Sequence, residues 1–130
     1  MQTIWPDSIK HAVSIQLGTV QLSNTGIDGC SGLFKDTSAT QGETEYTLAT
    51  NLQSKAFVHI NGKMIELQKS KANNSEGLIN EEYEGGGYKV LLNVKEGSRL
   101  GDELFQYKGE LIIRQNSKEK KINIVGEVGC

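Results

Sequence analysis

Apolar and polar residues alternate with a period of two along most of this chain, and helical spacing is nearly absent. Such alternation is typical of β-strands that bury one face. The clearest run covers residues 88–94, where Tyr88, Val90, Leu92 and Val94 share one face. The pattern therefore predicts an all-β protein built from short strands.

The strongest local signal is Asn61-Gly62, which lies between two alternating runs at residues 56–60 and 63–67. Asn-Gly in this setting predicts a two-residue type I′ turn and so fixes the register of a hairpin. The expected core face pairs Ile60 with Lys63, Val58 with Ile65, and Ala56 with Leu67. The other face pairs His59 with Met64 and Phe57 with Glu66.

Further strands are predicted at residues 11–17, 19–22, 45–50, 104–115 and 120–125. In the first of them Val13, Ile15 and Leu17 should share a face, and in residues 45–50 Tyr46 and Leu48 should point inward. Residues 78–83 fit either a helical turn or a ragged strand, and residues 69–77 are expected to be a loop.

The longest candidate strand, residues 104–115, should bend at Gly109, since glycine inside a strand often marks a bulge. A four-residue loop at 116–119 would then set Ile113 against Ile122 and Leu111 against Ile124. The same register sets Arg114 against Lys121, so that this face should be solvated.

These elements add up to about seven to nine strands with short connections, in a single antiparallel β domain that spans residues 1–130. The expected fold is a small antiparallel β-barrel or β-sandwich. A chain of 130 residues that is 36% hydrophobic and 6% aromatic can bury a small aliphatic core.

The two cysteines, Cys30 and Cys130, are predicted to form one disulfide. Their wide separation excludes a CxxC redox motif. A bridge would tie the glycine-rich loop around Cys30 to the end of the last strand, with Cα atoms about 4.4–6.8 Å apart. Two free thiols remain the alternative.

Disulfides persist in oxidising compartments, so we expect a periplasmic, secreted or cell-surface protein whose leader has been removed, with a lipid anchor on that leader as one option. The first residues do not resemble a signal peptide, which leaves a cytoplasmic location as the alternative. The net charge of −2 and the mixed signs argue against nucleic acid, and no apolar run is long enough to cross a membrane.

No catalytic, cofactor or metal site is expected. His11 and His59 are not spaced to serve a cysteine nucleophile, and the histidines and cysteines do not form the close pairs of a zinc site. Glu81, Glu82 and Glu84 lack the aspartates of a calcium loop and are interpreted as a solvated turn.

One surface is a candidate for partner binding, namely the non-core face of the Asn61-Gly62 hairpin with Phe57, His59 and Met64. Outward aromatic and methionine side chains suit protein contact. The alternative is that a loop, for example residues 69–78, covers them.

The leading hypothesis is an exported, non-enzymatic β domain that binds a macromolecular partner, as an enzyme inhibitor or an accessory lipoprotein domain does. This analogy rests on architecture alone. A second hypothesis is a carrier that holds a small apolar ligand inside a barrel. An uncharacterised enzyme is the third.

Overall fold

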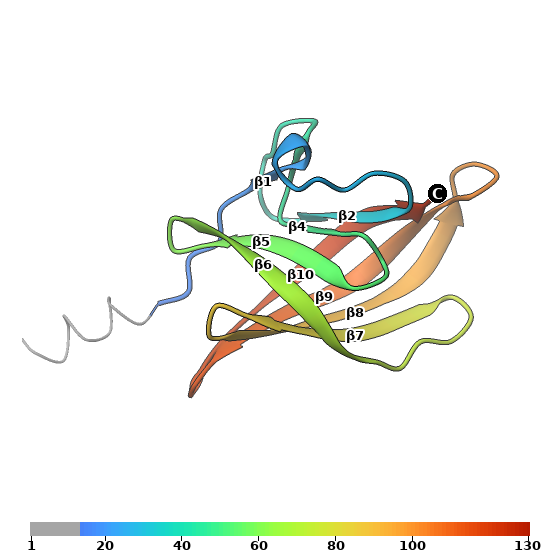
Figure 1. Ribbon diagram of the computed structural model, residues 1–130. Helices are drawn as coiled ribbons and strands as arrows, with labels where there is room; N and C mark the ends of the chain where they lie inside the picture. The colour runs from blue at the N-terminus through green and yellow to red at the C-terminus, as the bar shows by residue number, and fades with distance from the viewer. Residues whose placement is uncertain (1–13) are drawn as a thin grey trace, which may run out of the picture.

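The structure is a computed structural model that describes residues 14–130. Eight antiparallel strands form a closed barrel in the order β10-β2-β4-β5-β6-β7-β8-β9 (Figure 1). Their bounds are β2 Ser31–Asp36, β4 Leu48–Thr50, β5 Lys55–Ile60, β6 Lys63–Ala72, β7 Leu78–Gly85, β8 Tyr88–Arg99, β9 Leu104–Gln115 and β10 Lys118–Gly129. The predicted all-β fold is confirmed, as a barrel rather than a sandwich.

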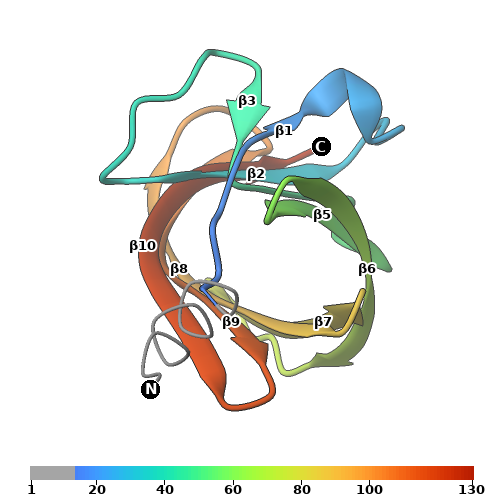
Figure 2. The same cartoon turned by 90° about the vertical axis from the view of Figure 1, so that its left-hand side faces the viewer.

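Outside the barrel, β1 (Val20–Gln21) pairs with β3 (Glu45–Tyr46) in a small second sheet, and a short 3-10 helix, η1, covers Leu22–Asn24. This sheet lies beside β2 on the outside of the barrel (Figure 2). Among residues 14–130 no helix is long and apolar enough to span a membrane.

Side chains from the inner faces of the strands fill the barrel. Phe34, Tyr83, Leu92 and Leu111 are among the largest side chains that are fully buried. The segment that precedes β1 passes across one end of the barrel (Figure 2), where Ile15 joins the core cluster. It is fixed there by backbone hydrogen bonds to His59 and Asn61.

The hairpin formed by β5 and β6 has the register that its Asn-Gly turn predicts. Val58 lies opposite Ile65, and His59 opposite Met64. Asn61 and Gly62 both have positive φ, at 49° and 86°, as a type I′ turn requires. The predicted face of β8 is also confirmed, since Val90, Leu92 and Val94 are buried.

The predicted register between β9 and β10 is wrong by two residues. Ile122 lies opposite Leu111 and Ile124 opposite Gly109, because the turn is shorter than expected. Asn116 adopts a positive φ of 56°, which lets the chain reverse within the turn between Gln115 and Lys118. A shift of two keeps each side chain on its predicted face.

The corrected register also removes the expected contact between like charges. Arg114 now lies opposite Glu119, and their side chains form an ion pair with a distance of 2.8 Å between Nε and Oε1. Lys121 instead lies opposite Ile112 on the same outer face. The predicted face is therefore exposed, but it carries paired charges rather than facing cations.

For residues 78–83 the strand alternative is confirmed, since they belong to β7. Three other expectations need correction. The strand β6 continues to Ala72, so the predicted loop at 69–77 is shorter and covers only residues 73–77. Both ladders of β9 pass Gly109 without a register shift, so the strand has no bulge there. Tyr46 is only half-buried on the outside, in contrast to Leu48.

The first predicted strand is described only in part. His11 and Val13 lie outside the described residues. Of the remainder, Leu17 forms one isolated bridge with Ile60, and the shared face is seen only in the burial of Ile15 and the packing of Leu17 against the core.

Candidate functional site

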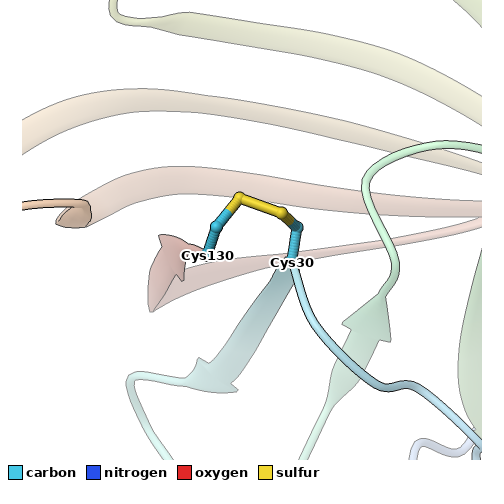
Figure 3. Close-up of a disulfide and its surroundings, with 2 residues drawn as sticks. All are labelled: Cys30 and Cys130. Atoms are coloured by element: carbon cyan, nitrogen blue, oxygen red, sulfur yellow. A yellow bond between two sulfur atoms is a disulfide. The ribbon is translucent and has the colours of Figure 1, made fainter.

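Cys30 and Cys130 form the predicted disulfide, with Cα atoms 3.9 Å apart (Figure 3). The separation is smaller than the expected range, and the two residues directly follow the last pair of the β2–β10 ladder, Ser31 with Gly129. They are therefore directly opposite each other on neighbouring strands. The bridge joins the first barrel strand to the last, and such a bond is typical of an oxidising compartment.

The predicted contact face of the β5–β6 hairpin is mostly covered. Phe57 is 5% exposed, and Gly18 packs so closely on the His59 ring that a Cβ there would clash with Nδ1. Met64 is 42% exposed and alone presents a large apolar surface. The covering segments precede β2, so the loop at 69–78 does not have this role. Binding at this face remains a prediction.

A buried polar network lies inside the barrel and centres on Glu81 of β7. Glu81 belongs to an acidic group that the sequence indicated as a solvated turn, yet it is 5% exposed. Its Oε1 accepts a hydrogen bond of 2.6 Å from the Tyr83 hydroxyl. That hydroxyl lies 2.9 Å from the Thr50 hydroxyl on β4. The network therefore links β7 to β4 across the interior.

The second oxygen of Glu81 receives two donors. Lys69 Nζ lies 2.9 Å from Oε2, and Asn74 Nδ2 donates to the same atom at 2.8 Å. Lys69 also donates to the carbonyl oxygen of Leu52 at 3.0 Å, and its ammonium lies 5.9 Å from the centre of the Tyr83 ring. The cation thus contacts the carboxylate, a carbonyl and an aromatic face.

Asn74 is held at both ends of its carboxamide. Its Oδ1 accepts a hydrogen bond from the backbone N–H of Asn80 at 2.8 Å, while its Nδ2 binds Glu81. The side chains of Lys69 and Glu81 are 16% and 3% exposed. Burial, together with the hydrogen bond to Glu81, raises the pKa of Tyr83 far above its ordinary value, so the phenol stays neutral.

The central groups of this network, Glu81, Tyr83 and Thr50, are buried and bonded to one another. Among residues 14–130 no three His, Cys, Asp or Glu side chains gather as a metal site would need. The sequence could not indicate the network, because Thr50, Lys69, Asn74 and Glu81 come from separate segments with no motif.

Among residues 14–130, two of the three exposed large apolar side chains lie at the tip between β8 and β9, where Leu100 is 45% and Leu104 37% exposed. The tip is held in place by several bonds. Arg99 donates from its guanidinium to the carbonyls of Gly101 and Asp102, at 2.8 and 2.9 Å. Leu100 N–H donates to Leu104 O, and Cys130 N–H donates to Glu103 O. The disulfide therefore supports this tip.

A hollow of about 310 Å³ lies next to the tip, on the outer wall formed by β9, β10 and β2. Its lining mixes apolar, aromatic and charged groups: Leu33, Lys35, Glu43, Tyr46, Gln106, Val125, Gly126 and Glu127. Lys35 Nζ lies 5.3 Å from the centre of the Tyr46 ring. Burial, then the nearby Glu127 and Glu43, raises the pKa of Tyr46 above its ordinary value.

The tip and the hollow form one continuous outer surface. Leu104 lies opposite Gly129 on β10, and Gln106, two residues further along β9, lies opposite Glu127. We call this the tip face, defined by Leu100, Leu104, Gln106, Tyr46 and Glu127. The sequence identified neither part of it, since a leucine beside a turn gives no sign of its exposure.

Comparisons with protein-family models, curated proteins and solved structures found nothing that matches this chain.

Proposed function

We propose that this chain is a non-enzymatic β domain of an oxidising, extracytoplasmic compartment, and that it binds a protein partner through the tip face. The observation that carries the proposal is a pair of exposed leucines on a turn held by backbone, guanidinium and disulfide contacts. Exposed apolar side chains gain most from burial in a partner when the turn beneath them is already ordered.

The composition of the tip face supports a protein partner. It combines leucine and tyrosine side chains with the polar groups of Gln106 and Glu127. Protein interfaces usually join apolar and aromatic side chains with polar ones. The mixed charges of the hollow give no stripe of cations of the kind that follows a nucleic-acid backbone.

The packing of the barrel favours this proposal over a carrier of apolar ligands. A carrier needs an internal space lined by apolar side chains. Here Phe34, Leu48, Tyr83 and Leu111 occupy the centre with no exposed surface. An enzyme is favoured less, because the buried polar groups around Glu81 are already bonded to one another.

Capture of partners from an extract of the source cells tests the proposal. The oxidised domain is immobilised beside the variant Leu100→Glu/Leu104→Glu and the variant Met64→Glu. Both variants place charge on exposed positions, so folding should be unchanged. We expect the tip variant to lose the captured protein, which is then identified and purified to measure its affinity directly.

The tip face and the β5–β6 hairpin face give different outcomes in this experiment. Loss of binding at least tenfold in the tip variant, with Met64→Glu unchanged, supports the proposal. Loss only in Met64→Glu would move the contact to the β5–β6 hairpin and overturn the tip face. Binding by both variants that equals binding by the unchanged domain would also contradict the proposal.

A further inference from the structure

We propose that Lys69 and Asn74 become joined by an amide bond between their side chains, and that Glu81 catalyses its formation. The inference concerns the buried network and does not depend on any partner. It rests on three groups that have the roles of nucleophile, electrophile and proton carrier, and the proton carrier, Glu81, contacts the other two in the folded chain.

The nucleophile and the leaving group contact the same oxygen atom of Glu81. Lys69 Nζ and Asn74 Nδ2 lie 2.9 and 2.8 Å from Glu81 Oε2. A carboxylate in this position can accept a proton from the amine and deliver it to the amide nitrogen without moving. This is the positioning that a general acid–base step requires.

The electrophile is polarised in advance. Asn74 Oδ1 accepts a 2.8 Å hydrogen bond from the backbone N–H of Asn80. Negative charge develops on this oxygen when an amine adds to the carboxamide carbon, and a fixed backbone donor stabilises such charge. Both ends of the carboxamide are thus held.

The surroundings keep Glu81 in place. Its other oxygen is bound by the Tyr83 hydroxyl at 2.6 Å, and Tyr83 and Thr50 have no exposed surface. The neutral amine is the form that attacks the carboxamide carbon, and Glu81 is placed to take the proton that Lys69 gives up.

The step balances without any co-reactant. Lys69 Nζ passes one proton to Glu81 Oε2, and its lone pair then forms a bond with Asn74 Cγ while the carbonyl electrons move to Oδ1. Glu81 delivers its proton to Nδ2 and takes a second proton from Nζ. The bond from Cγ to Nδ2 breaks, the carbonyl re-forms, and ammonia leaves and takes up the remaining proton of Glu81.

The bond would close a ring from the end of β6 to the start of the loop before β7. Four residues, Ser70 to Asn73, lie between the joined positions, and the pairing of β6 with β7 shifts register between Lys69 and Lys71. A covalent link would fix this irregular part of the β6–β7 ladder.

Intact mass spectrometry of the folded, oxidised protein tests the proposal, before and after prolonged incubation. We expect a mass below that of the disulfide-bonded chain by one molecule of ammonia. Tryptic digestion should then give one branched peptide in which residues 64–71 are joined to residues 72–89, since acylated Lys69 is no longer cleaved. The full mass, with separate peptides after incubation, would refute the proposal.

Three variants distinguish this bond from cyclisation of an asparagine on its own backbone, which also releases ammonia. Lys69→Arg keeps the cation but removes the reactive amine, and Asn74→Ala removes the electrophile. Glu81→Gln keeps the size of the proton carrier and removes its basicity. All three should retain the full mass. Loss of ammonia that persists in Lys69→Arg would assign it to asparagine cyclisation and overturn the bond.

Discussion

Removal of the Cys30–Cys130 bond should lower the free energy of unfolding by about 3 kcal/mol. The bond connects residues separated by 100 positions. In the chain-entropy account a loop of this size restricts the unfolded chain by an amount worth about 4–5 kcal/mol. Measured losses for natural disulfides are often smaller, at about 2–5 kcal/mol, because reduced chains keep some structure.

The folded state adds a local effect to this value. The bridge continues the β2–β10 ladder, so without it the pair formed by Ser31 and Gly129 becomes the frayed end. The bond from Cys130 N–H to the Glu103 carbonyl is then free to open, and the β8–β9 tip loses part of its support. Hydrogen exchange at residues 103–105 and 126–130 should therefore increase more than exchange in β7 and β8.

Urea unfolding followed by far-UV circular dichroism measures the main effect. The wild-type protein is compared with and without reductant, and Cys30→Ser/Cys130→Ser separates loss of the bond from side reactions of free thiols. The slope against urea should rise on reduction, because a chain without the cross-link exposes more surface. A loss below about 1 kcal/mol would refute the reasoning and weaken the disulfide as a sign of an oxidising compartment.

Three further outcomes are expected. Burial and Glu81 raise the pKa of Tyr83 above its ordinary value of 10.0. The contribution of Tyr83 to stability is therefore complete below pH 10 and falls as the pH rises above 10, because the tyrosine of the unfolded chain ionises first. In urea titrations Tyr83→Phe should flatten this fall. Gly109→Ala should cost about 1–3 kcal/mol in the same assay because its Cβ would strike the Asn93 carbonyl, whereas Gly101→Ala on the exposed tip should cost little. Asn116→Gly should preserve stability within about 0.5 kcal/mol, since φ is positive there, and a large loss would contradict the turn geometry.

The local sequence pattern was sufficient to predict strand register where a turn residue and the alternation agreed. The Asn61-Gly62 turn admits one register, and alternation on both sides assigns the buried face. The turn at Asn116 gave no equally strong signal, so its length and hence the β9–β10 register were predicted wrongly. The faces were still correct, because an error of two residues does not change the side of a strand on which a residue lies.

The buried polar network around Glu81 could not be predicted from local sequence pattern, for a physical reason. Glu81 alternates with Ile79 and Tyr83 and so lies on the inner face, but a glutamate beside two other acidic positions suggests solvent. Its burial depends on Lys69, which the sequence placed in a loop, and on Asn74 beyond it. Only the closed barrel brings these segments together, and polar partners from separate strands leave no trace in local alternation.

The disulfide and the polar network both stabilise the part of the barrel where strand pairing is shortest. β9 and β10 are paired over twelve residues, whereas β2 with β4, and β4 with β5, are paired over only three each. A closed barrel is complete only if every neighbouring pair holds, so these short ladders are where it would open first. The disulfide fixes β2 to β10 on one side of them.

On the other side, Thr50 connects β4 to Tyr83 of β7, and Lys69 of β6 holds the carbonyl of Leu52 in the turn between β4 and β5. Leu52 has a positive φ of 65°, a conformation that needs such support in a residue other than glycine. Residues that the sequence suggests are loop or surface groups thus hold the short strands in place. Because the disulfide and the interior hold the short strands, the exposed leucines at the β8–β9 tip are not needed for that purpose, which supports the proposal that they bind a partner.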